Sequence, residues 1–311
     1  MLVTVALAHG AGARSAPQAA RAAAPAPRTR TPLAPASFAP GACVALAPTH
    51  GDRHRTVVLD AGHGGIDPGA VGATSDGHQV TEGQLNLPVE LDAAELLRGE
   101  GFRVVVTRTA DTTVERLGPG DVVGGALTIT ASHADVVARA RCADLAGASA
   151  LVGLYLDAGA PSAAGCVTVY DTARPFAADN ERLAGLVQAD VLDAMDARGW
   201  AIPDEGAVPD SEFGSSVASA TSTLAAQARS YPHLLELGPG EGSFNPSPTS
   251  MPGAVIEPLF LTDAFEADIA ASAAGQHVIA AAVAAAVTTF LTPPAPPPGA
   301  APGTAGAPTR G

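Results

Sequence analysis

Short apolar runs alternate with longer amphipathic segments between residues 56 and 291. The runs are rich in β-branched and aliphatic residues, as in strands buried on both faces of a sheet. Predicted strands are 56–61, 103–107, 150–156, 165–170 and 254–257. Predicted helices are 82–99, 134–147, 177–198, 222–229, 263–273 and 275–291. Loops are expected at 110–133, 201–216 and 238–252.

The alternation of strands and helices predicts an α/β fold, a single domain with a mostly parallel central sheet flanked by helices. Residues 1–54 and 293–311 are rich in Ala, Pro and Gly and have no apolar periodicity. Such segments bury too little apolar surface to offset the entropy of ordering. We therefore expect a largely disordered export segment at 1–54, a folded domain at 55–292 and a disordered tail at 293–311.

Composition narrows the classes of partner. The 311-residue chain is 47% hydrophobic and carries a formal net charge of −14. This acidity argues against nucleic acid and anionic membranes as partners. We find no apolar run long enough to span a bilayer. The first eight residues are apolar but lack a basic region, so they resemble at most a truncated signal peptide.

Three cysteines, Cys43, Cys142 and Cys166, lack the spacing of a zinc knuckle. Two interpretations remain open. If the protein is exported, Cys43 can form a disulfide with Cys142 and leave Cys166 as a thiol. Alternatively, all three are buried free thiols.

Candidate chemistry gathers at strand ends and helix starts. His63 follows a buried strand within a glycine-rich loop, Glu82 opens a helix, and Glu257 ends an apolar run. Each residue alone has a plain structural explanation, such as a turn histidine or a glutamate that complements a helix dipole. Together they suit a catalytic zinc site, in which nitrogen and carboxylate ligands leave one position for water and a second carboxylate acts as base.

Several motifs together resemble the zinc-dependent N-acetylmuramoyl-L-alanine amidases of the Amidase_3 family. The G-H-G-G loop at 62–65 is similar to the family's histidine loop, and the segment 82–87 resembles its E-x-x-x-N-L motif. Further similar segments are 103–109, 139–144 and 251–257. The resemblance covers most of residues 56–291. It implies that His63 and Glu82 bind Zn2+ and that Glu257 is the catalytic glutamate.

The family's third zinc ligand is a histidine, and Tyr155 stands at the aligned position. Three outcomes are open: Tyr155 binds as a phenolate, another group replaces it, or zinc is bound weakly or not at all. Asp157 is the first candidate for a replacement, because residues two apart on a strand face the same way. His78 and His133, in loops predicted to reach the same edge, come next.

The resemblance implies an enzyme that hydrolyses the amide between the lactyl group of muramic acid and L-alanine in peptidoglycan. The alternative is a degenerate amidase, with Tyr155 in place of the ligand, that binds peptidoglycan fragments without cleaving them. The expected partner is peptidoglycan or a muropeptide. We further expect a monomer that is secreted or located in the cell envelope.

Overall fold

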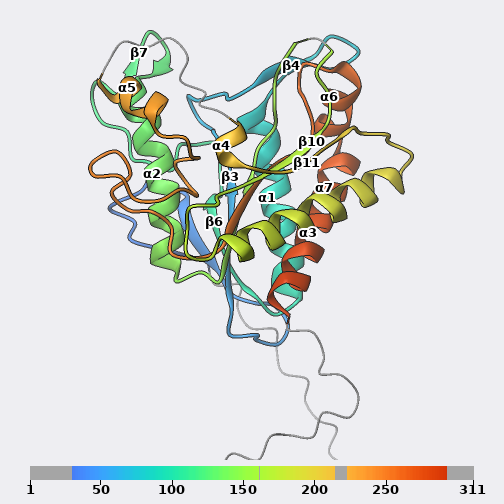
Figure 1. Cartoon of the computed structure of the whole chain (residues 1–311), viewed down its shortest axis with the longest axis horizontal. Coiled ribbons are helices and arrows are strands. Elements are labelled where there is room, and N and C mark those ends of the chain that lie inside the picture. The colour runs from blue at the N-terminus through green and yellow to red at the C-terminus, as the bar shows by residue number, and fades with distance from the viewer. Residues whose placement is uncertain (1–29, 161, 214–222, 293–311) are drawn as a thin grey trace, which may run out of the picture.

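A computed structural model describes residues 30–160, 162–213 and 223–292 (Figure 1). The strands in these residues are β1 (Arg30–Pro32), β2 (Ala42–Leu46), β3 (Thr56–Ala61), β4 (Val71–Ala73), β5 (Gln79–Thr81), β6 (Arg103–Arg108), β7 (Val122–Val123), β8 (Ala126–Leu127), β9 (Ala150–Leu154), β10 (Cys166–Tyr170), β11 (Asp204–Pro209) and β12 (Gly253–Glu257). The helices are α1 (Glu82–Gly99), α2 (Ile129–Ala146), α3 (Ala177–Asp196), α4 (Asp210–Phe213), α5 (Thr223–Ser230), α6 (Ala264–Ala271) and α7 (Ala273–Leu291).

One eight-stranded sheet has the order β1-β2-β6-β3-β9-β12-β10-β11. Its centre, formed by β6, β3, β9 and β12, is parallel throughout. β2 runs antiparallel to β6, and β10 runs antiparallel to β12 while pairing in parallel with β11. This topology confirms the predicted α/β domain with a mostly parallel sheet.

Helices cover both faces of the sheet. α1, α3 and α7 form one layer, and α2 lies on the other face (Figure 1). Alternate side chains of each central strand enter opposite cores: Val57 and Leu59 of β3 pack on the side of α1, and Val58 packs on the side of α2. This two-sided burial explains why the central strands are apolar without a polar alternation.

The predicted domain boundary at residue 54 is wrong for the segment 30–54. β1 and β2 belong to the sheet, and β2 pairs along β6 with all five of its residues buried. Because β2 is short and lies among Pro, Ala and Gly residues, its composition resembles that of the preceding low-complexity segment. Pairing with β6, which is distant in the sequence, makes it a strand. Residues 1–29 and 293–311 lie outside the described residues.

The loop predicted at 201–216 also contains secondary structure. β11 adds an edge strand next to β10, and α4 follows it directly. The sequence of β11, Asp-Glu-Gly-Ala-Val-Pro, has no strand periodicity. An edge strand tolerates such a sequence, because half of its backbone groups do not take part in the ladder.

A disulfide joins Cys43 and Cys142, so the disulfide interpretation is confirmed over that of free thiols at these two positions. It connects β2 to α2. Cys166 is a buried free thiol in β10, and burial raises its pKa.

α7 corrects the expectation that no apolar run is long enough for a bilayer. By length and composition alone it could cross one. In the folded chain, however, more than half of this stretch is buried, and Ile279, Val283 and Val287 pack into the core shared with α1 and α3. α7 is therefore a core helix of this domain.

Candidate active site

Four candidate residues lie at one edge of the sheet. β3, β9 and β12 are parallel, so their carboxyl ends meet at this edge. His63 follows β3, Asp157 follows β9, Glu257 is the last residue of β12, and Glu82 is the first residue of α1. The chain between β3 and α1 passes through β4, which lies near α6 at the top of Figure 1.

The loop after β3 needs unusual backbone angles. His63 has a left-handed backbone, with φ of 56°, and Gly64 and Gly65 also have positive φ. Gly69 lies close against the site: a Cβ there would come within 2.5 Å of Glu82 Oε2 and 2.6 Å of the His63 ring. Glycine at this position thus lets the loop close over the imidazole.

The His63 ring lies between two carboxylates. Its Nδ1 is 2.8 Å from Asp67 Oδ2, and its Nε2 is 3.3 Å from Glu82 Oε2. Burial by itself lowers the pKa of His63, but the hydrogen bond with Asp67 and the charge of Glu82 outweigh it and raise the pKa above its usual value. A carboxylate on one ring nitrogen orients the other nitrogen, as in many metal-binding histidines.

Glu82 is 3% exposed and held by three donors. Its Oε2 accepts a hydrogen bond from the Ala70 N–H at 2.8 Å. Its Oε1 accepts one from the Leu156 N–H at 3.0 Å and one from Asn86 Nδ2 at 3.3 Å. Burial raises the pKa of Glu82, and the nearby His63 partly opposes this rise. The backbone of two other segments therefore fixes the carboxylate that faces the imidazole.

Asp157 and Glu257 are hydrogen-bonded side chains at neighbouring strand ends, and both are partly exposed. Burial raises the pKa of Glu257 well above its usual range, and the charges of Asp157 and Glu82 raise it further. The charge of Glu82 thus acts on both the His63 imidazole and Glu257, and Glu257 in turn contacts Asp157. A divalent cation would balance this charge, and imidazole with carboxylate oxygens is a donor set that Zn2+ accepts. The types of donor present at this edge therefore suit a zinc ion.

Tyr155 has a different set of contacts. Its hydroxyl donates to Asp60 Oδ2 at 3.0 Å, and its ring packs on Gly62, where a Cβ would come within 2.3 Å of it. Burial raises the pKa of Tyr155 well above its usual value, and the charge of Asp60 adds to this. In this environment the phenol keeps its proton, which makes it a poor metal ligand.

Arg139 lies on α2 and supports the loop that contains His63. The sequence motif at 139–144 indicated no role for it. Its guanidinium is 1% exposed and forms ion pairs with Asp60 at 2.7 Å and Asp135 at 2.8 Å. It also donates to the carbonyl oxygens of Ala61 at 2.7 Å and His63 at 2.8 Å. Its spacing of four residues from Asp135 on a helix was the available signal.

The two substitute histidines have other environments. His133 Nε2 lies 2.7 Å from the carbonyl oxygen of Phe244. His78 is exposed in the turn between β4 and β5, where its backbone bonds to Thr74. Neither imidazole is held against Glu82 as His63 is.

Comparisons with known proteins agree on the fold. An N-acetylmuramoyl-L-alanine amidase from Clostridium difficile 630 is 22% identical with a TM-score of 0.51, covering 76% of this chain and 96% of its own. The CwlD amidase of Clostridioides difficile, solved in complex with the GerS lipoprotein, is 20% identical with a TM-score of 0.55, covering 76% and 98%. The AmiC2 amidase of Nostoc punctiforme is 20% identical with a TM-score of 0.52, covering 78% and 99%. At these identities the likeness shows the shared fold.

No curated protein sequence matches the chain significantly. The sequence profile of the Amidase_3 family, described as N-acetylmuramoyl-L-alanine amidase, matches residues 57–289. This range contains His63, Glu82, Asp157 and Glu257. Because the match extends over most of the sequence, the chain belongs to the Amidase_3 family of N-acetylmuramoyl-L-alanine amidases.

Proposed function

We propose that this chain is a zinc-dependent amidase that hydrolyses the amide between the lactyl group of muramic acid and L-alanine in peptidoglycan. His63, Glu82 and Asp157 would hold Zn2+, and Glu257 would be the catalytic base. The observation that carries the proposal is the 3.3 Å approach of His63 Nε2 to Glu82 at the strand edge where Asp157 and Glu257 also meet.

When bound, Zn2+ would lower the pKa of a water molecule and polarise the scissile carbonyl. Glu257 would accept the proton of the attacking water and pass it to the leaving amine of L-alanine. Asp67 holds the His63 ring, and the N–H groups of Ala70 and Leu156 hold Glu82. These contacts keep the ligand atoms in place without substrate, which lowers the cost of reaching the reactive geometry.

Asp157 is the better third ligand on chemical grounds. It is a carboxylate at the same strand edge, in direct contact with Glu257. Tyr155, in contrast, uses its hydroxyl proton for Asp60. The contact between Tyr155 and Asp60 also supports the second candidate function, a degenerate amidase that binds peptidoglycan fragments. If Tyr155 does not bind zinc and no other residue replaces it, the site has one ligand fewer and a lower affinity for zinc.

Zinc content separates these assignments. After dialysis, Tyr155→Phe is expected to hold as many zinc ions per chain as the wild type, and Asp157→Ala about one fewer. Loss of zinc in Tyr155→Phe with retention in Asp157→Ala would assign the phenol as ligand instead. A gain of about one zinc per chain from the wild type to Tyr155→His, with no loss in Asp157→Ala, would establish the degenerate amidase.

Removal of the base tests the reaction itself. Glu257→Gln is expected to keep zinc and to lower the rate of muropeptide cleavage by at least about 100-fold, because the amide side chain cannot accept the proton. Release of L-alanine peptides from a purified muropeptide measures the rate. A variant that keeps most of its activity would exclude Glu257 as the base.

We also propose that the enzyme acts outside the cytoplasm. The Cys43–Cys142 disulfide supports this location, because such bonds persist in oxidising compartments. Cell fractionation with thiol labelling tests it: oxidised protein in the extracellular or envelope fraction is expected. Reduced protein confined to the cytoplasm would contradict the proposal.

A further inference from the structure

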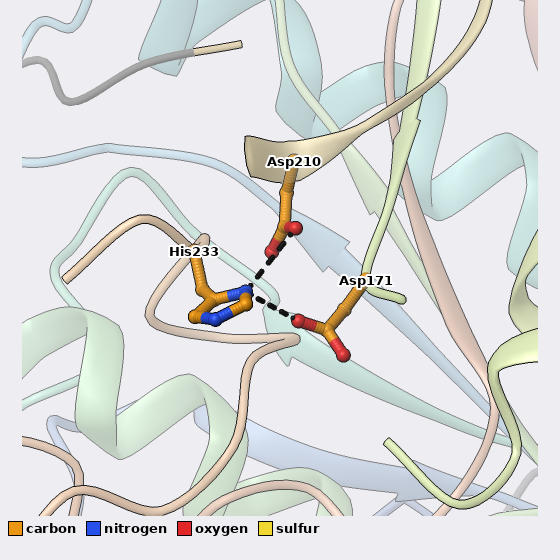
Figure 2. A group of neighbouring side chains, drawn as sticks. All are labelled: Asp171, Asp210 and His233. Atoms are coloured by element: carbon orange, nitrogen blue, oxygen red, sulfur yellow. Dashed lines mark hydrogen bonds and ion pairs between the residues drawn. The ribbon is translucent and has the colours of Figure 1, made fainter. Parts of the chain in front are cut away.

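A second group of metal-binding side chains lies at the ends of the two outermost strands on the β12 side of the sheet. Asp171 directly follows β10, and Asp210 directly follows β11. β10 and β11 are parallel with Tyr170 paired to Pro209, so the next residue of each strand brings a carboxylate to the same place. His233, in the segment after α5, faces them (Figure 2).

The three side chains each present one ligand atom, and these atoms lie within 4.8 Å of one another. His233 Nδ1 is 2.8 Å from Asp171 Oδ2 and 3.3 Å from Asp210 Oδ1. Figure 2 shows this nitrogen turned toward both carboxylates. Both aspartate side chains are fully buried, and the imidazole is 16% exposed.

The backbone anchors one oxygen of each carboxylate. Asp171 Oδ1 accepts a hydrogen bond from the Ala173 N–H at 2.8 Å, and Asp210 Oδ2 accepts one from the Leu234 N–H at 2.9 Å. The other oxygen of each is left for the cluster. This is the arrangement of metal-binding carboxylates that are oriented by supporting hydrogen bonds.

The hydrogen bonds within the cluster are incomplete. Nδ1 carries at most one proton, so it cannot make a well-aligned hydrogen bond to each of the two carboxylates. Asp171 Oδ2 is buried and makes no hydrogen bond of good geometry, although it lies near the ring nitrogen. A buried carboxylate oxygen without a hydrogen bond is costly, and a cation placed between the oxygens and Nδ1 would remove that cost.

The net charge of the cluster also favours a bound cation. Two buried carboxylates face one imidazole, which supplies at most one positive charge. The nearby Arg174 donates its guanidinium hydrogens to the carbonyl oxygens of Leu237, Gly238 and Thr249. A divalent cation would balance the cluster.

The cluster is separate from the amidase centre. β10 is antiparallel to β12, and Val167 pairs with Glu257. Asp171 comes four residues after Val167, just past the end of β10. At the rise of an extended strand it lies roughly 13 Å from Val167. The two sets of side chains therefore lie at opposite ends of β12.

We propose that Asp171, Asp210 and His233 form a second metal site, which takes Zn2+ or a related first-row divalent cation. The imidazole favours such ions over Mg2+ and Ca2+, which prefer oxygen ligands alone. The site holds the segment that follows α5 against the ends of β10 and β11. Its role is structural, so it stabilises the fold and takes no part in hydrolysis.

The test counts zinc in a His63→Ala background, which removes the proposed catalytic ion and makes the result independent of amidase activity. His63→Ala is expected to keep about one zinc per chain after dialysis and to melt higher with zinc than with chelator. Asp210→Asn and His233→Gln, each added to His63→Ala, are expected to lose both the ion and the zinc-dependent rise in melting temperature.

Asp179→Asn in the same background is the matched control, because it removes one negative charge from an exposed ion pair on α3. It is expected to behave as His63→Ala alone. Circular dichroism verifies that each variant is folded, and the two independent cluster variants guard against loss of folding in one. The proposal is overturned if His63→Ala holds no zinc, if both cluster variants keep it, or if only Mg2+ or Ca2+ stabilises the protein.

Discussion

The Asp67 carboxylate determines how the His63 ring is presented. It occupies Nδ1 and leaves Nε2 toward Glu82. It also accepts a hydrogen bond from the Gly69 N–H at 3.2 Å, which ties it to the loop that closes over the ring. Asp67 is thus a positioning residue that acts through the imidazole.

Asp67→Ala is expected to weaken zinc binding at the His63 centre by about 10- to 100-fold, because the imidazole loses the contact that orients it. Competition with a zinc chelator measures the affinity. Asp111→Ala is the control, since Asp111 bonds to the Gly65 N–H in the same loop. Equal affinities of the two variants would contradict this role.

α1 and β6 are joined by a buried carboxyl group. Glu90 Oε1 accepts hydrogen bonds from the Thr107 N–H at 2.8 Å and the Thr107 hydroxyl at 3.2 Å, while its Oε2 has no hydrogen-bond partner. Burial raises the pKa of Glu90 from 4.5 to about 8, and the nearby Arg108 only partly opposes this. The helix therefore packs on the strand with a protonated acid at neutral pH.

This pKa shift predicts a pH-dependent stability. Between pH 4.5 and about 8 the folded chain keeps the Glu90 proton, whereas the unfolded chain has released it. The contribution to the unfolding free energy is thus complete below pH 4.5 and is lost as the pH rises through about 8. Urea unfolding of the wild type and Glu90→Gln across this range measures it. The wild type should lose stability relative to the variant as the pH rises, and a constant difference would refute the assignment.

The disulfide joins two elements that lie far apart in the sequence. Cys43 and Cys142 are 99 residues apart and connect β2 to α2. Replacing both by alanine is expected to lower the unfolding free energy by about 2–5 kcal/mol, since the crosslink restricts the unfolded chain. Denaturant unfolding measures the loss, with Cys166→Ala as a control that keeps the bond. An unchanged unfolding free energy would count against this contribution.

The charge of the whole chain affects how it meets its substrate. With a net charge of −14, the protein is expected to repel wall fragments that carry anionic polymers. Raising the salt from about 0.01 M to 0.15 M shortens the screening length from about 30 Å to 8 Å. Cleavage of such fragments is expected to become faster over this range, while cleavage of a small muropeptide changes little. A falling rate on the fragments would show that attraction dominates.

Most of the fold follows from local patterns. The central strands and α3, α6 and α7 coincide with predicted segments, because their side chains are apolar at strand or helical spacing. β2 and β11 did not show such patterns. Each is a strand because a partner, β6 or β10, supplies its hydrogen bonds.

The sequence by itself determined the family, the α/β class and the candidates His63, Glu82, Asp157 and Glu257, because motifs and periodicity are properties of neighbouring residues. Only the tertiary structure decided what each side chain meets. In the folded chain the Tyr155 hydroxyl donates a hydrogen bond to Asp60, and Cys43 forms its disulfide with Cys142. Asp171, Asp210 and His233 come together at the ends of two strands. These contacts join residues far apart along the chain, and only the register and packing of the folded sheet bring them together.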